Sequence, residues 1–102
     1  MTFEELCAQV AVGPGFSRKK AFGRDGLMLD GKAVLCSDPE GVVFRVGPGQ
    51  EPEALAASGA RPWQPVPGGR GPRGWVLVPG SAGEHYPRLA ELALRFVGSL
   101  QK

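Results

Sequence analysis

The chain has 102 residues, a hydrophobic share of 42% and a formal net charge of +2. A chain of this length is typical of one domain, and it buries about 65% of the surface that it exposes when unfolded. A core of that size needs no metal or disulfide to hold it. The net charge is too small to demand a polyanionic partner. We therefore expect a single globular domain over residues 1–102.

The two cysteines, Cys7 and Cys36, are far apart and form no metal-binding spacing. Each lies in an apolar run, where a free thiol behaves as a small hydrophobic group. A disulfide between the two cysteines is the alternative. No stretch approaches the roughly 18 apolar residues that span a bilayer. The acidic start of the chain lacks the cationic and apolar regions of a signal peptide. We expect a cytoplasmic protein with no membrane association.

The N-terminal segment has the pattern of a helix, with apolar residues at Phe3, Leu6, Cys7 and Val10. These positions share one helical face. Thr2 and Glu5 match a capping box, in which each side chain bonds a free backbone N–H of the first turn. The helix must end by the Gly-Pro-Gly sequence at 13–15.

The next part of the chain reads as a sheet. Residues 16–26 look like a loop or an irregular strand, and clear strands follow near 27–29, 33–36 and 42–46. Asp30-Gly31 lies between the first two of these strands and favours a two-residue hairpin turn with positive φ.

The second half adds a short helix at 51–58, a doubtful extended segment at 60–66, a flexible turn at 67–74 and a strand at 75–78. The last helix has a continuous apolar face from Leu89 to Leu100. Its start lies between 82 and 88, with Ser81 and Glu84 as a second possible capping box. The element order is α-β-β-β-α-β-β-α. It predicts a two-layer α+β sandwich, with helices packed on one face of an antiparallel sheet of four or five strands.

Candidate catalytic residues are scarce. His85 is the only histidine and there is no GxSxG motif, so the sequence offers no evident nucleophile and base. The close carboxylates lie at helix starts or in turns, where acids are common for structural reasons. We predict no catalytic residue, no metal site and no cofactor. A pocket that gathered His85, Tyr86 and these acids would instead indicate a small-ligand or enzymatic role.

Two cationic segments are the candidate binding residues. Arg18, Lys19 and Lys20, followed by Arg24, are interleaved with Phe16 and Phe22, and Arg70 and Arg73 lie in a Gly-rich segment. Cations beside aromatic rings suit nucleic-acid binding. The alternative is that the first segment is a solvated edge strand protected by lysine and the second a plain hairpin connection.

From residue 20 to residue 31 the chain resembles the N-terminal domain of the TfoX/Sxy family, which is related to the MmcQ/YjbR group. Phe22-Gly23 match the family's pattern, whereas Ala21 replaces a usual Met and Arg24 stands where a second Gly is common. The resemblance continues through Val43-Phe44-Arg45-Val46, Ala57-Ser58-Gly59, Trp63 and the strand from Trp75 to Pro79, and it covers residues 3–100.

This resemblance implies a two-layer fold of the kind also seen in secretion chaperones. It implies a role in the regulation of competence genes for members with a second, C-terminal domain, for which this chain has no room. It supplies no catalytic residues. The expected function is thus a non-enzymatic binding protein, either a transcription regulator that contacts DNA through the cationic segments or a protein-interaction module such as a homodimer.

Overall fold

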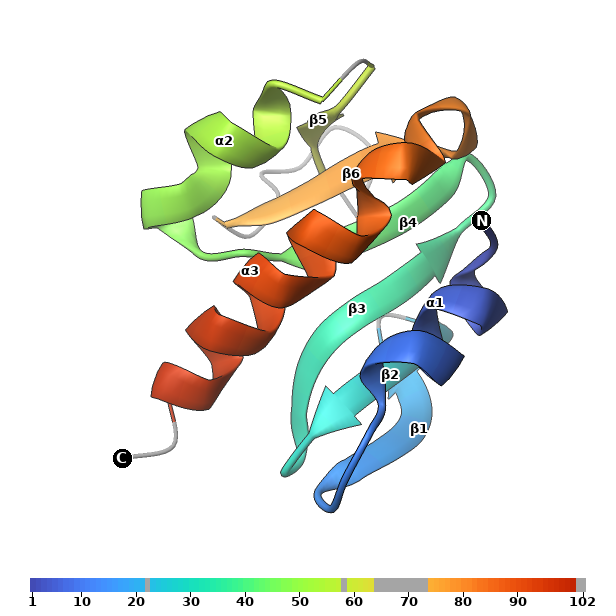
Figure 1. Ribbon diagram of the computed structural model, residues 1–102, viewed down its shortest axis with the longest axis vertical. Helices are drawn as coiled ribbons and strands as arrows, with labels where there is room; N and C mark the ends of the chain where they lie inside the picture. Colours follow the sequence, from blue (N-terminus) through green and yellow to red (C-terminus); the bar gives the residue numbers. More distant parts are fainter. Residues whose placement is uncertain (22, 58, 64–73, 101–102) are drawn as a thin grey trace.

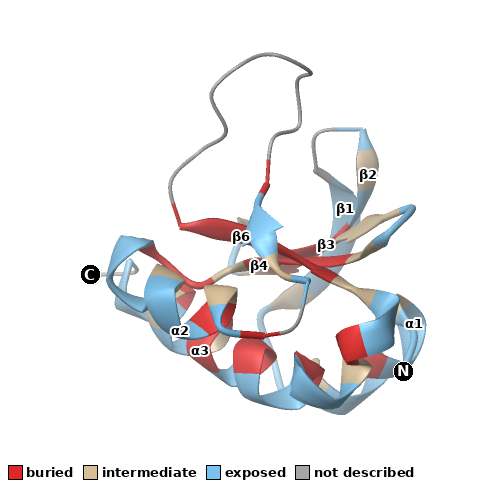
Figure 2. Ribbon diagram, turned by 90° about the horizontal axis from the view of Figure 1, so that it is seen from above, coloured by how far each residue is buried: buried red, intermediate tan, exposed pale blue. Residues whose placement is uncertain are grey.

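The computed structural model describes residues 1–21, 23–57, 59–63 and 74–100 of the chain. Its elements are α1 (Phe3–Val10), β1 (Phe16–Ala21), β2 (Arg24–Leu29), β3 (Lys32–Asp38), β4 (Gly41–Arg45), the 3-10 helix η1 (Pro48–Gln50), α2 (Glu51–Leu55), β5 (Arg61–Pro62), β6 (Trp75–Pro79), the 3-10 helix η2 (Gly80–His85) and α3 (Tyr86–Ser99). The strands form one antiparallel sheet of six in the order β1-β2-β3-β4-β6-β5, and the helices lie together on one face of it (Figure 1, Figure 2). The predicted two-layer α+β architecture is confirmed.

The sheet has more strands than predicted because residues 16–26, expected to be a loop or an irregular strand, supply β1 and the first half of β2. The two strands pair in register from Phe16 opposite Leu29 to Ala21 opposite Arg24. The prediction left the choice between a loop and a strand open because it relied on apolar alternation, whereas the residues from Ser17 to Lys20 are all exposed. The strand depends on backbone hydrogen bonds to β2, which place little demand on its side chains.

The Asp30-Gly31 turn joins β2 to β3, as the sequence predicted. Leu29 pairs with Lys32 across the turn, and φ is positive at both turn residues, 50° at Asp30 and 82° at Gly31. This is the type I′ geometry, whose twist matches that of the flanking strands. Glycine adopts the left-handed region without strain, and aspartate tolerates it better than most residues.

A β-bulge in β3 explains why its apolar run does not alternate. The register between β2 and β3 shifts after Leu27, which leaves Val34 as an extra residue in β3. Val34 and Leu35 therefore both face the helices and are fully buried, whereas Cys36 faces the opposite side of the sheet. The extra residue bends the strand and increases its twist, and one strand thus supplies buried side chains to both faces.

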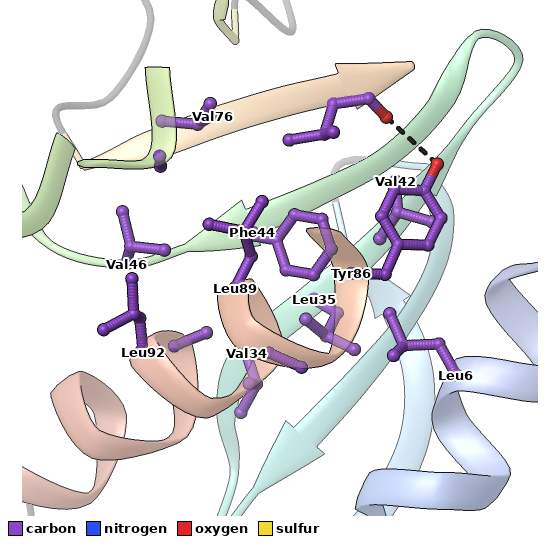
Figure 3. Packing of buried hydrophobic residues seen from close by; sticks show 14 of the residues in the cluster. Leu6, Val34, Leu35, Val42, Phe44, Val46, Val76, Tyr86, Leu89 and Leu92 are labelled. Carbon is purple, nitrogen blue, oxygen red and sulfur yellow. Dashed lines mark hydrogen bonds between the residues drawn. The ribbon is translucent and has the colours of Figure 1, made fainter. Parts of the chain in front are cut away.

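The main core lies between the sheet and the helices, and α3 covers its centre (Figure 3). The rings of Tyr86 and Phe44 lie 5.4 Å apart between centroids, and both side chains are almost fully buried. The Tyr86 hydroxyl donates a hydrogen bond of 3.1 Å to the backbone oxygen of Val78 on β6, which satisfies this polar group inside an apolar core. Aliphatic side chains complete the cluster, among them Leu6, Leu27, Val34, Leu35, Val42, Val46, Val76, Leu89, Leu92 and Val97.

A second apolar cluster lies on the opposite side of the sheet, which we call the outer face. It consists of Met28, Cys36, Val43, Trp63, Trp75 and Leu77, all of them buried. The rings of Trp63 and Trp75 lie 5.6 Å apart, and the Trp63 amide donates to the Trp75 carbonyl at 3.0 Å. Both tryptophans therefore anchor this face of the sheet.

The capping box at the start of α1 is present, since the side chains of Thr2 and Glu5 each accept a hydrogen bond from the other's backbone N–H. The second box expected at Ser81 and Glu84 is absent, because both residues lie within η2 and α3 begins only at Tyr86. No helix in the described part of the chain is long and apolar enough to cross a membrane.

In the second half of the chain, three expected segments differ from the structure in their bounds or lie partly outside the described residues. The helix expected at 51–58 ends at Leu55, because the next backbone N–H groups bond carbonyls only three residues back and tighten the turn. The extended segment expected at 60–66 is a strand only at β5, and residues 64–66 lie outside the described part. The flexible turn expected at 67–74 also lies outside it, apart from Gly74.

Gly41 lies where β4 packs closely against β6, and a substitution at this position tests that contact. A Cβ atom at this position would overlap the carbonyl oxygen of Val78 and would lie 2.8 Å from the Cα of Pro79. Both are backbone atoms that cannot rotate away, so we expect Gly41→Ala to lower the free energy of unfolding by about 2 kcal/mol. Urea unfolding followed by circular dichroism measures this loss. Gly49→Ala is the control, because no described atom lies within 4 Å of a Cβ there, and an equal loss in both variants would contradict the expectation.

Candidate binding site

The predicted cations Arg18, Lys19 and Lys20 lie on β1, the edge strand of the sheet. Arg18 faces the helix side and makes two hydrogen bonds to Glu4 of α1, from Nη1 to Oε1 at 3.0 Å and from Nη2 to Oε2 at 2.7 Å. Its guanidinium also lies 5.0 Å from the centre of the Phe3 ring. The hydrogen bonds from Arg18 lower the pKa of Glu4, so this carboxylate stays charged and remains the arginine's partner.

Lys20 and Lys19 differ in their partners. Lys20 Nζ lies 3.0 Å from Asp25 Oδ1 on β2, and this hydrogen bond lowers the pKa of Asp25. Lys19 is exposed and forms no ion pair with the residues that the structure describes. Lys19 therefore offers a charge on β1 that no described carboxylate balances.

Arg24 belongs to a different group of side chains on the outer face. Its Nε lies 3.7 Å from Asp38 Oδ2. The same carboxylate accepts a hydrogen bond from the Trp63 indole at 3.3 Å, and its Oδ1 accepts one from the backbone N–H of Glu40 at 3.0 Å. Asp38 is thus held at the β3–β4 turn, and Arg24 is held next to it.

A hollow of about 560 Å³ opens on the outer face beside this group, and we call it the outer-face hollow. Charged residues line its rim, with Arg24 beside Asp38 and Arg61 paired with Glu40. Each guanidinium has a carboxylate next to it, so these four side chains carry no net charge. The described lining residues include no nucleophile and no histidine, and the arrangement suits neither phosphate binding nor acid–base chemistry.

A second hollow, of about 360 Å³, lies between α1 and β1, and we call it the α1–β1 hollow. Glu4 and Arg18 stand at its rim, and its apolar lining is Cys7, Ala8, Ala11, Phe16 and Leu27. The small side chains on α1 leave this space open. Burial raises the pKa of the Cys7 thiol to about 11, so this wall of the hollow is neutral at physiological pH.

The hollow borders a free edge of the sheet, since β1 pairs only with β2 among the described strands. The backbone N–H of Asp30 donates to Gly15 O at 2.8 Å, which marks a hydrogen-bonded pair just before β1. Hydrogen-bonded and non-bonded pairs alternate along an antiparallel ladder. The N–H and C=O groups of Phe16, Arg18 and Lys20 therefore point away from β2, toward the open edge.

The four predicted site residues that the structure describes do not form one patch. The structure places Arg18, Lys19 and Lys20 on β1, sets Arg24 apart beside Asp38, and does not describe Arg70 and Arg73. Phe22, the aromatic residue expected among the first cations, also lies outside the described residues.

His85 and Tyr86 do not meet in a pocket either. The Tyr86 hydroxyl is bonded inside the core, while His85 is half-exposed and lies at the start of α3.

Sequence reasoning missed the α1–β1 hollow. Its walls come from α1, β1 and β2 and are mostly small or common apolar residues, which carry no distinctive signal. The lysines of β1 did indicate an edge strand, because natural sheets place lysine on exposed edges.

Comparisons with protein-family models, curated proteins and solved structures find no match to this chain. The resemblance to the TfoX/Sxy N-terminal domain therefore stays a prediction. Within the described residues, no group of three or more His, Cys, Asp or Glu side chains is placed to hold a metal ion.

Hydrogen exchange tests whether the edge of β1 is free. The N–H groups of Arg18 and Lys20 point outward, whereas those of Ser17 and Lys19 bond β2. We expect Ser17 and Lys19 to exchange at least about ten times more slowly than Arg18 and Lys20 after correction for intrinsic rates. Nuclear magnetic resonance resolves each amide, and equal protection at all four would show that something covers the edge.

Thiol labelling tests the burial of the two cysteines, which are both free. Burial raises the pKa of the Cys7 thiol to about 11 and that of Cys36 to about 12. Because only the thiolate reacts, we expect native protein at pH 8 to resist an aromatic disulfide reagent and guanidinium-unfolded protein to label at both residues. Absorbance measures the released thiol. Rapid labelling of the native protein would contradict this expectation.

Proposed function

We propose that this chain is a binding protein without a catalytic role, and that it binds an extended segment of another protein by strand addition at β1. One observation carries the proposal. The edge strand directs the backbone groups of Phe16, Arg18 and Lys20 away from the sheet, directly beside the α1–β1 hollow. Strand addition needs an open edge with a hollow beside it. The main-chain hydrogen bonds to the edge supply affinity, and the hollow supplies specificity by accepting a side chain of the partner.

The energetics of the edge are compatible with a modest, reversible interaction. Each backbone hydrogen bond gained contributes about 0.5–1.5 kcal/mol net, because the exposed groups already bond water. Burying a partner side chain adds to this, and the loss of translational and side-chain freedom opposes it. β1 is already paired with β2 in a sheet that two apolar clusters hold in place. Binding therefore costs this protein little conformational entropy.

Contact with DNA, the other role expected from the resemblance, has less support in the described residues. Arg18, Lys20 and Arg24 each have a carboxylate within ion-pair distance. A phosphate backbone would have to compete with these carboxylates, which reduces the favourable release of counterions on binding. Lys19 is the one cation of β1 without a carboxylate partner among the described residues, so we place a protein partner ahead of nucleic acid.

A second copy of this chain is also a poor partner for β1. Antiparallel pairing of two β1 strands would bring the segment Arg18–Lys20 of one copy against the same segment of the other. Like charges directly opposite each other on paired strands are destabilising, and edge lysines are a common device against such pairing. The partner we propose is therefore a different protein.

The proposal is tested by selecting binders from a library of random peptides displayed on phage. We expect synthetic copies of the selected peptides to bind Lys20→Pro at least about tenfold more weakly than Lys20→Ala, a loss of about 1.4 kcal/mol. Proline removes the outward N–H of residue 20 but no ladder bond to β2, and alanine is the matched control that keeps this N–H. Fluorescence anisotropy measures both affinities.

Two controls make this result decisive. Thermal unfolding of both variants checks that the fold is intact. A short DNA duplex is titrated at two salt concentrations with the native protein and with an Arg18/Lys19/Lys20→Ala variant. Peptides that bind both Lys20 variants equally, or salt-dependent DNA binding that the triple variant loses, would overturn the proposal.

A further inference from the structure

We infer that the partner segment carries two consecutive acidic residues next to a small apolar residue, whose side chain enters the α1–β1 hollow. This inference rests on the function proposed above and specifies the chemistry of the partner. It follows from the direction of the side chains on β1, from the lining of the hollow and from the charges on this edge.

The side chains of β1 alternate between the two faces of the sheet. Ser17 lies opposite Met28, which belongs to the outer-face cluster, whereas Arg18 lies opposite Leu27 of the main core. Phe16, Arg18 and Lys20 therefore face the helix side, and Ser17 and Lys19 face outward. A strand added at this edge alternates in the same way, because paired residues share a face.

The partner residue opposite Arg18 points toward the α1–β1 hollow. The Arg18 side chain does not fill this space, because it is held at the rim by Glu4 and the Phe3 ring. The wall beyond it is apolar and includes the buried, protonated thiol of Cys7. A small aliphatic side chain fits such a wall, whereas a charged one would lose its hydration against it, and the two charged groups at the rim are already paired with each other.

The next two partner positions face cations. Lys19 on the outward side has no ion pair with a described residue. Lys20 on the helix side has one ion pair, with the exposed carboxylate of Asp25. Acidic residues opposite these two lysines gain cross-strand attraction. Since Arg18, Lys19 and Lys20 are consecutive, the partner residues are consecutive too. The order is acidic, acidic, apolar in an antiparallel partner, and the reverse in a parallel one.

The probe is a short capped peptide with a central Glu-Glu-Val and a fluorophore at one end, measured by fluorescence anisotropy. The comparison peptides carry Lys-Lys-Val or Glu-Glu-Lys at the same three positions. We expect the first change to weaken binding at least about tenfold, less so at high salt, because it reverses two charges. We expect the second to weaken binding about tenfold, because it places a charge in the apolar hollow.

Matched protein variants locate the effect. Ala8→Leu narrows the α1–β1 hollow from an exposed position of α1, and Gln9→Leu places the same side chain on the neighbouring exposed position. We expect only Ala8→Leu to lower affinity for the Glu-Glu-Val peptide. Lys19→Gln and Arg95→Gln each remove one exposed cation, and we expect only the change on β1 to weaken binding, by a few-fold.

The outcomes separate this inference from the proposed function. If the Glu-Glu-Val and Lys-Lys-Val peptides bind equally, and both bind Lys20→Pro more weakly than Lys20→Ala, strand addition stands and the acidic partner is wrong. If no peptide distinguishes these two variants, both proposals fail. Stable dimers in light scattering that exclude the peptide, or a DNA duplex that displaces it, would also overturn the acidic-peptide partner.

Discussion

The packing of α3 across the middle of the sheet is the contact on which the rest of the structure depends. Tyr86 lies against Phe44 and bonds the backbone of β6, so one side chain ties the helix to two strands. This contact covers the central strands and leaves β1 to the short helix α1 (Figure 1). The sheet is thus covered at its centre, and the small residues of α1 leave a hollow beside the β1 edge.

Charge pairing shapes how that edge meets other molecules. The carboxylates of Glu4 and Asp25 lie beside Arg18 and Lys20 and come from neighbouring elements. They reduce the general attraction of the strand for polyanions, while the lysines still discourage pairing between copies of the chain. The strand addition that we propose would therefore be selective, because the partner must supply both backbone pairing and matching charge.

The two hollows show why shape alone does not identify a site. The outer-face hollow is the larger, but its arginines and acids balance each other, and Asp38 is engaged by Trp63 and by the β3–β4 turn. The smaller α1–β1 hollow adjoins backbone groups that have no partner in the sheet. Unused hydrogen-bonding capacity beside an apolar space makes the smaller hollow the better candidate for a binding site.

The sequence by itself determined the features that depend on near neighbours. These are the Asp30-Gly31 turn, the capping box of Thr2 and Glu5 and the apolar face of α3, and they were enough to predict the two-layer fold. The strand β1 was expected only as one alternative, beside a loop, because its residues from Ser17 to Lys20 lack apolar alternation and its pairing comes from β2. Only the tertiary structure decided that Arg18 meets Glu4, 14 residues away, and that β1 is left at an open edge. Contacts between distant segments depend on how the chain packs as a whole, which no local pattern records.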